Sequence, residues 1–323
     1  MYRKELEIAL NAVRKASHLC RKVQNSLVTV SAIEKKDRSP VTIADFGSQA
    51  VINLELLEFF PNDPIVAEED AEVLLGNAEL REQVLGLVNE QKNAITASRM
   101  TNAIDLGSLD TDFAKRFWTV DPIDGTKGFL RGEQYAVALA LVEKGEVMLG
   151  VLGCPNFETD NGEKGCLFYA VRGQGAFMHS LDNDTEKPVS VDSIRDAAQA
   201  CFCESFEKAH ASHEVHESIS SGLGITAPAR RMDSQAKYAA VSCGQASIYL
   251  RLPRSRAYRE KIWDHAAGAI VVAEAGGRVT DFSGRILDFS AGRTLENNVG
   301  ILASNGHLHN EVLRAISEVR SEK

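Results

Sequence analysis

The chain has 323 residues, of which 44% are hydrophobic and 25% charged, and its formal net charge is −9. This composition is that of a globular protein, with enough residues for one large domain or two of ordinary size. The acidic balance argues against binding to nucleic acid or to an anionic membrane surface, and no stretch approaches the roughly 20 apolar residues that cross a bilayer. The N-terminus resembles neither a signal peptide nor a transit peptide, so we expect a cytoplasmic protein, with an organellar location left open.

Apolar residues recur every three or four positions over residues 6–23, which predicts an amphipathic first helix. After a break near Pro40, residues 42–45 form a capping box, and we expect a second helix to open there. Ile65–Ala67 is predicted to be a short strand, and a third helix is expected over 77–91. The polar stretch that follows residue 91 shows no assignable pattern.

Two β-prone runs, 135–142 and 147–154, are joined by Glu-Lys-Gly-Glu, which predicts a hairpin. Further short β-prone runs extend an antiparallel sheet to about residue 191. From there strand and helix patterns alternate, with a long helix expected over 263–275 and ended by two glycines. The order of elements predicts an α/β (α+β) fold with two subdomains, 1–192 and 193–323, that share one active cleft.

The most informative stretch is 118–126, which places Asp121 and Asp124 three residues apart where an apolar, β-prone segment ends. The proline between them favours an extended Asp121, and the glycine after Asp124 permits a sharp turn. Both carboxylates and the Ile123 carbonyl can then converge on one point, and such oxygen ligands suit Mg²⁺. The alternative is an Asx-type turn that simply closes a strand.

Three other acids lie at element boundaries, namely Asp45, Glu68 and Asp264. Singly, each has a structural explanation: a capped first turn for Asp45, a solvated acidic run for Glu68, and a first-turn helix acid for Asp264. Gathered in one cleft, the carboxylates would repel one another unless cations neutralised them. Two or three Mg²⁺ ions, a pair of them about 3.5–4 Å apart, would do this, bind a phosphate and activate a water to attack it.

One segment of this acidic chain is basic, since residues 229–261 hold eight lysines and arginines and two acids, a balance of +6. Such a field suits a small anionic ligand held beside a cation. The alternative, a solvated basic loop, stays open for Arg254, Arg256 and Arg259. Three histidines at 210, 213 and 216 raise the question of zinc, but their spacing drifts around a helix and no cysteine joins them, so zinc is not expected.

The chain resembles the lithium-sensitive, magnesium-dependent phosphatase superfamily that includes inositol monophosphatases and fructose bisphosphatases. The shared motifs are Ala67-Glu68-Glu69, Asp121-Pro122-Ile123-Asp124-Gly125-Thr126, and Trp263-Asp264 with Glu274-Ala275-Gly276-Gly277. The 3′(2′),5′-bisphosphate nucleotidase branch is the closer match, through segments 39–45, 124–132, 135–139, 233–238 and 260–265. The resemblance runs nearly end to end and implies a layered α/β/α/β/α sugar-phosphatase fold.

The resemblance also implies roles for individual residues. The metal ligands would be Glu68, Asp121, the Ile123 carbonyl, Asp124 and Asp264. The attacking water would be aligned and deprotonated by Asp45 together with Thr126. The substrate contacts would come from Gly125, Thr126, His210, Ser234, Lys237, Arg251 and Asp264. Two of these, Lys237 and Arg251, fall within the basic segment, as recognition of an anion requires.

The activity that the resemblance implies is hydrolysis of the 3′-phosphate of adenosine 3′,5′-bisphosphate to AMP and phosphate, with 3′-phosphoadenylyl sulfate as a further substrate. Such an enzyme clears a by-product of sulfate transfer in sulfur metabolism and is inhibited by Li⁺ or Na⁺. We expect a monomer. Two alternatives stay open, an inositol mono- or polyphosphate phosphatase and a catalytically silent anion sensor. Residues 71–117 carry no motif.

Overall fold

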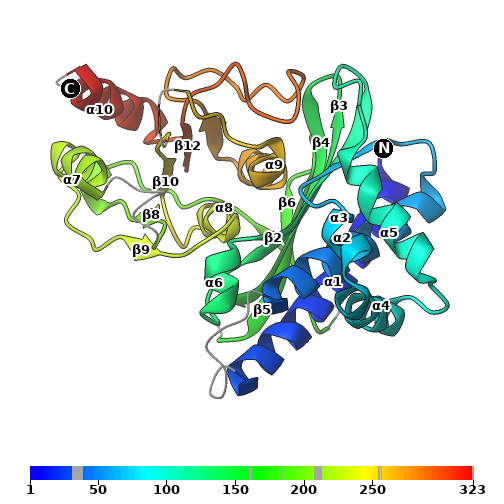
Figure 1. Ribbon diagram of the computed structural model, residues 1–323. Helices are drawn as coiled ribbons and strands as arrows, with labels where there is room; N and C mark the ends of the chain where they lie inside the picture. The colour runs from blue at the N-terminus through cyan, green and yellow to red at the C-terminus, as the bar shows by residue number, and fades with distance from the viewer. Residues whose placement is uncertain are drawn as a thin grey trace.

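The computed structural model describes residues 1–323 except 31–38, 160–161, 184, 207–212, 254, 256 and 322–323. Helices, a sheet, a pair of helices, a second sheet and a last pair of helices follow one another across the molecule (Figure 1). The α/β/α/β/α layering expected from the sequence is therefore confirmed. The two sheets divide the chain between residues 189 and 202, while the subdomain ranges 1–192 and 193–323 stay a prediction.

The first layer consists mainly of two long helices, α1 (Arg3–Val30) and α2 (Ser39–Phe59). The buried face of α1 follows the predicted spacing, with Val13, Ala16 and Cys20 all fully buried. Helix α2 begins three residues before the expected capping box. Its proline therefore lies in the first turn, where the missing N–H removes no helical hydrogen bond.

Three shorter helices complete this layer: α3 (Glu72–Gly76), α4 (Ala78–Gln91) and α5 (Ala97–Asp105). Helix α4 confirms the predicted third helix, and the Asn77 side chain caps it by accepting a hydrogen bond from the Leu80 N–H at 3.0 Å. Helix α5 lies in the stretch that the sequence pattern left unassigned.

The N-terminal sheet has seven strands in chain order. They are β1 (Ile65–Ala67), β2 (Arg116–Asp124), β3 (Ala136–Glu143), β4 (Glu146–Glu158), β5 (Lys164–Val171), β6 (Ala176–Ser180) and β7 (Glu186–Val189). Strand β1 pairs with β2 in parallel, and all later pairs are antiparallel. The predicted hairpin is confirmed as β3–β4. Its turn residues Lys144 and Gly145 both have positive φ, as a two-residue type I′ turn requires.

Both faces of this sheet are covered, and on β3 the two faces differ in side-chain size. On β3, Val137 and Leu139 belong to the core under α1 and α2, whereas Ala138 and Ala140 face the opposite core. Small residues at such positions let a helix approach closely. At Gly150 of β4 the approach is so close that an added Cβ would lie 2.6 Å from the Ile270 side chain.

The helices on that second face are α8 (Ala236–Ser242) and α9 (Ala266–Glu274). Beyond them the second sheet has the strand order β11-β12-β10-β8-β9. Its strands are β8 (Phe202–Glu204), β9 (Arg230–Arg231), β10 (Ile248–Arg251), β11 (Arg278–Thr280) and β12 (Ile301–Ser304). The outer layer consists of α7 (His213–Gly222) and α10 (His309–Ser321).

The prediction of a long helix over 263–275 is wrong for the first turn of that helix. The structure has a 3₁₀ turn at Ile262–Asp264, and α9 begins only at Ala266. His265 separates the two with φ −136°, which is not a helical value. Asp264 therefore ends a short turn and does not sit on the first turn of the helix.

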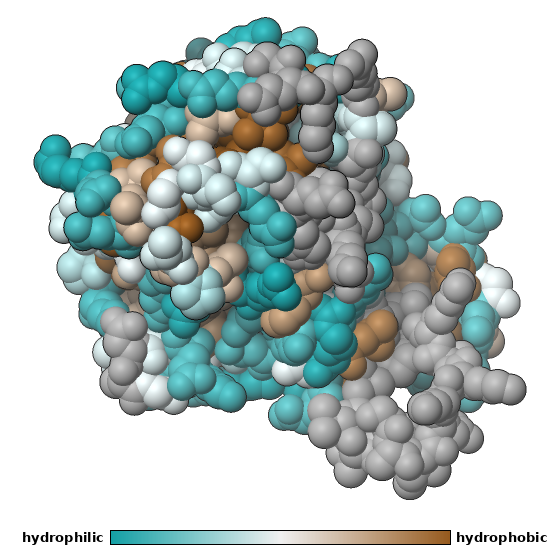
Figure 2. Space-filling model, turned by 90° about the vertical axis from the view of Figure 1, so that its left-hand side faces the viewer, coloured by the Kyte–Doolittle hydropathy of each residue, from teal (hydrophilic) through white to brown (hydrophobic). Residues whose placement is uncertain are grey.

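No helix among the described residues is long and apolar enough to cross a membrane. Seen from the side of α7 and α10, the surface is mainly hydrophilic, with apolar residues gathered in small areas between polar ones (Figure 2).

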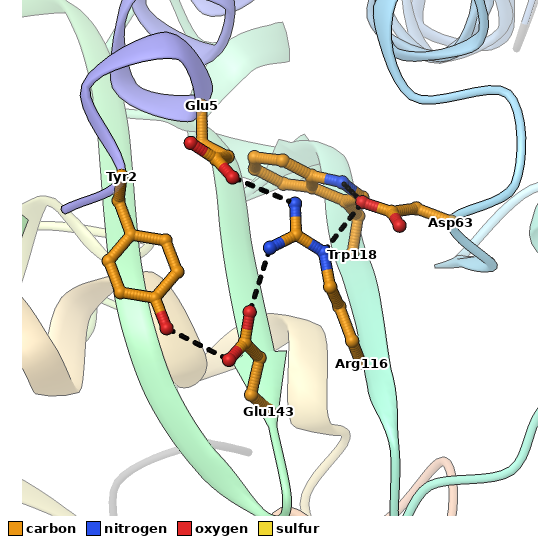
Figure 3. A network of polar contacts seen from close by, with 6 residues as sticks. All are labelled: Tyr2, Glu5, Asp63, Arg116, Trp118 and Glu143. Atoms are coloured by element: carbon orange, nitrogen blue, oxygen red, sulfur yellow. Dashed lines mark hydrogen bonds and ion pairs between the residues drawn. The ribbon is translucent and has the colours of Figure 1, made fainter.

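A polar network fixes the start of β2, the strand whose other end carries the acidic motif (Figure 3). Arg116 pairs with Glu5 of α1 at 3.2 Å, with Asp63 at 2.8 Å and with Glu143 of β3 at 2.7 Å. The Tyr2 hydroxyl donates to Glu143 at 2.8 Å, and Asp63 also accepts an indole N–H. One guanidinium thus joins the first helix, the segment before β1 and two strands.

Candidate active site

Two acids meet at the carboxyl ends of the parallel strands β1 and β2. The register pairs Ala67 with Val120, so the next residue on each strand brings Glu68 beside Asp121. Burial raises the pKa of Asp121, and the charge of Glu68 beside it raises that pKa further.

The turn after Asp121 is shaped by an irregularity in the sheet. Pairing of β2 with β3 shifts between Asp121 and Asp124, and a bulge of this kind redirects side chains next to active sites. Helix α2 supports the bulge, since the Ser48 hydroxyl donates to the Pro122 carbonyl at 2.9 Å. The register shift and the Ser48 hydrogen bond therefore fix the backbone of the turn in which the sequence predicts that Asp121 and Asp124 converge.

Gly125 ends this turn and directly precedes α6 (Thr126–Leu130). Its φ of +87° suits glycine, and an added Cβ would lie only 2.8 Å from the Ser234 Cβ. Beyond Ser234, the backbone N–H of Gln235 donates to Asp124 Oδ2 at 2.6 Å. A segment from the second half of the chain thus docks on the turn and orients one of its acids.

These elements surround a cavity of about 230 Å³. Most of the residues predicted for the site line it, namely Glu68, Asp121, Ile123, Asp124, Gly125, Thr126, Ser234, Arg251 and Asp264. Residues from both sheets therefore face one another across a single space. The lining also includes three residues that were not assigned a role, Lys127, Ser205 and Asp233. Two of these lie in quoted motifs, whereas Ser205, directly after β8, carries no sequence signal.

Asp45 lies behind the lining on α2 and is only 8% exposed. It is three residues before Ser48, so the two side chains lie on the same face of the helix, toward the turn. Burial raises its pKa well above the ordinary value, and the charges of Glu69 and Glu68 raise it further. Asp45 therefore belongs to the same acidic group, and its pairing with Thr126 stays a prediction.

Lys237 is also buried, at 1% exposure. Its Nζ donates to the Met232 carbonyl at 3.3 Å and lies 5.2 Å from the centroid of the Tyr249 ring. Burial lowers the pKa of the ammonium, and the negative charge of Asp124 opposes that shift. His210 lies outside the described residues.

Burial raises the pKa of Glu68, Asp121, Asp124 and Asp264, and the charges of neighbouring acids raise it further for Glu68, Asp121 and Asp264. For Asp121 burial is the main cause, followed by the charges of Glu68 and Asp124. The pKa of Glu68 rises to about 7. Burial is the largest cause, and the charges of Glu69 and Asp124 add to it, although the residue is exposed where it lines the cavity. The pKa of Asp264 is raised well above its ordinary value by burial and by the charge of Asp124.

This acidic group has the chemistry of a site for a divalent cation. All its donors are oxygens, the ligands that Mg²⁺ prefers. Asp121 Oδ1 is buried without a hydrogen-bond partner, and a buried oxygen of this kind is costly unless a proton or a cation satisfies it. A bound cation would both satisfy that oxygen and remove the repulsion that raises the pKa values.

A second group of polar residues supports Arg251, which lines the cavity. Ligand atoms of Glu260, Asp264 and His265 lie within 4.8 Å of one another. Both oxygens of Glu260 are engaged, one by Arg251 Nε at 3.1 Å and the other by His265 Nε2 at 3.4 Å. Burial opposes ionisation, but His265 and Arg251 lower the pKa of Glu260 to about 2. This group holds the Arg251 guanidinium, which also lies 3.9 Å from Asp264 Oδ2.

Comparison with known proteins gives consistent matches over the whole chain. Residues 1–321 match the inositol monophosphatase family. The chain is 43% identical to a 3'(2'),5'-bisphosphate nucleotidase of Schizosaccharomyces pombe, covering 98% of this chain and 96% of that protein. It is 44% identical to a protein of the same name from Dictyostelium discoideum, covering 96% of each.

The solved structures show the same likeness. A Thermotoga maritima IMPase aligns with a TM-score of 0.64 at 25% identity, over 100% of this chain and 99% of that one. A staphylococcal IMPase-II aligns with a TM-score of 0.66 at 17% identity, over 98% of this chain and 97% of that one. The second match is a likeness of fold alone.

Proposed function

The chain belongs to the inositol monophosphatase family, as its motifs predicted, and we propose that it is a 3'(2'),5'-bisphosphate nucleotidase. It removes the 3′-phosphate of adenosine 3′,5′-bisphosphate and yields AMP and phosphate, and it also accepts 3′-phosphoadenylyl sulfate. The observation that carries the proposal is the cavity, in which a group of oxygen ligands faces the guanidinium of Arg251. Relatives that share 41–44% identity over nearly their whole length and bear this name support the choice of substrate.

We propose Mg²⁺ as the metal, with two or three ions per site. The residues that would hold it are Glu68, Asp121, the Ile123 carbonyl, Asp124 and Asp264. The orphaned Asp121 oxygen and the raised pKa values of the acids support this assignment. When bound, such ions supply a polarised phosphate and a water that can be deprotonated near neutral pH.

The chain's own side chains would bind and orient the phosphate. The Glu260 carboxylate holds Arg251 from one side at 3.1 Å, so the guanidinium is pre-oriented at the cavity wall. A fixed guanidinium recognises an anion with two parallel N–H bonds. Ser234, Lys237 and His210 are proposed as further substrate contacts, and Gly125 leaves the space in which Ser234 sits.

Asp45 and Thr126 are proposed to align the attacking water and accept its proton. Thr126 is exposed at the first position of α6, and its hydroxyl lies 3.4 Å from the Ile123 carbonyl. The raised pKa of Asp45, which burial causes, makes its carboxylate a stronger base than an ordinary aspartate.

The proposal includes a monomer that works in the cytoplasm. The six cysteines are free thiols, which is the usual state of cysteines in a reducing compartment.

A phosphate-release panel tests the proposed activity. The substrates are adenosine 3′,5′-bisphosphate, 3′-phosphoadenylyl sulfate, inositol 1-phosphate and inositol 1,4-bisphosphate, each with Mg²⁺ and with EDTA. We expect the highest kcat/KM on the nucleotide bisphosphate, only with Mg²⁺, and inhibition by Li⁺. Faster release from an inositol phosphate would instead identify an inositol phosphatase. Asp121→Asn should release no phosphate in this panel. Asp112→Asn serves as its control, since Asp112 is exposed and pairs with Lys115 on the surface.

A further inference from the structure

Arg293 lies in the segment between β11 and β12, far along the chain from the first strand that it reaches. Its Nη1 donates to the Gly107 carbonyl at 2.8 Å, and its Nη2 donates to the carbonyl of Ala67, the residue before Glu68. The two acceptors are adjacent because Gly107 packs on Ala67, where an added Cβ would lie 2.5 Å from the Ala67 Cβ. The guanidinium is therefore fixed at the carboxyl end of β1.

The same guanidinium packs on the residue before another proposed metal ligand. The Arg293 Cζ lies 4.9 Å from the centroid of the Trp263 ring, and Trp263, at 6% exposure, directly precedes Asp264. The surrounding backbone is held as well, since the Ile262 N–H donates to the Arg293 carbonyl at 3.1 Å. Arg293 thus contacts both the strand end that carries Glu68 and the turn that carries Asp264.

The chemistry of these contacts suits positioning. The hydrogen-bond acceptors are neutral carbonyls, and the third contact is a cation–π packing on an indole face. None of these three contacts uses a carboxylate oxygen of Glu68 or Asp264. Arg293 can therefore fix the spacing of the two acids without competing for the oxygens that would bind a cation.

We propose that Arg293 is a positioning residue that joins the two sides of the cavity and holds Glu68 and Asp264 at the spacing that divalent ions require. This inference rests on the proposed metal-dependent function. Residues that orient metal ligands from behind typically change metal affinity by about 10–100-fold when they are replaced. The fork of two N–H bonds is specific to arginine, because lysine presents a point charge that does not span two carbonyls.

The test compares Arg293→Met and Arg293→Lys with the control Arg285→Met. Arg285 is an exposed arginine in the same segment. Mg²⁺ and Mn²⁺ affinities are measured by calorimetry without substrate, and kcat is measured on adenosine 3′,5′-bisphosphate over a Mg²⁺ titration. We expect Arg293→Met to bind Mg²⁺ about tenfold more weakly, with Arg293→Lys in between and Arg285→Met like the wild type. We further expect saturating Mg²⁺ to restore most of the kcat, which a general structural defect would not allow.

Wild-type Mg²⁺ affinity in a folded Arg293→Met protein would overturn the inference, as would a loss of kcat that persists at saturating Mg²⁺ with unchanged affinity. If circular dichroism shows that Arg293→Met does not fold, Arg293→Lys decides in the same way. Failure of the proposed function looks different, because the wild type itself would then bind no Mg²⁺ or release no phosphate from the nucleotide.

Discussion

Replacing Gly125 by alanine should disturb the site through one methyl group. Two costs follow from the structure. The positive φ of +87° costs alanine about 1–2 kcal/mol, and the new Cβ would lie 2.8 Å from the Ser234 Cβ, so the backbone must shift. An overpacked contact of this kind adds about 1–3 kcal/mol. The shift would move Gln235, whose N–H holds Asp124 at 2.6 Å, and a displacement of about 1 Å can lower turnover about 100-fold.

Gly173→Ala is the matched control for this prediction. Gly173 has nearly the same φ, +76°, but an added Cβ would meet nothing within 4 Å. Urea unfolding should therefore show a loss of about 1–2 kcal/mol for Gly173→Ala with unchanged kcat, and a larger loss for Gly125→Ala together with the fall in kcat. Wild-type turnover in Gly125→Ala would refute the argument that the 233–235 segment orients Asp124.

Three further predictions concern the acids and the network at the start of β2. Asp121→Asn should abolish turnover and the rise in Tm that Mg²⁺ produces, yet it should not lower the Tm in EDTA, because burial and the charges of Glu68 and Asp124 raise the pKa of Asp121 and so disfavour its charged form; a lower Tm in EDTA would contradict this. The pKa of Glu68, about 7, means that protons compete with the ion, so calorimetry should show Mg²⁺ affinity falling by up to about tenfold per unit as pH drops below 7; equal affinity at pH 8 and pH 6 would argue against Glu68 as a ligand. Arg116→Met should lower the free energy of unfolding in urea by about 1–2 kcal/mol, since three carboxylates lose their shared partner. Its kcat at saturating Mg²⁺ should stay within about twofold of the wild type; a larger fall in kcat would show that the network shapes the site.

The parts of the fold that sequence predicts well are those governed by local patterns. The hairpin at Lys144 and Gly145 follows from turn chemistry, and α4 follows from its periodicity. Helix α5 was missed because it is short and follows a polar stretch. Its Thr96 cap, which accepts the Arg99 N–H at 3.2 Å, is a signal that could have revealed it.

The site divides in the same way. The turn between Asp121 and Asp124 is specified by adjacent residues, so its shape could be predicted. The meeting of Glu68 with Asp121 depends on the register of two strands that are distant in the sequence, and no local pattern specifies it. The contacts of Gln235 and Arg293 are equally long-range, and neither residue belongs to a periodic pattern that would indicate its partner.

The most direct measurement is a crystal structure of the protein soaked with Mn²⁺, with the ions located by anomalous scattering. We predict ion peaks inside the cavity, about 2.1 Å from oxygens of Glu68, Asp121, Asp124 and Asp264. Peaks between Glu260 and His265, or an empty cavity in crystals that hold the ion elsewhere, would contradict it.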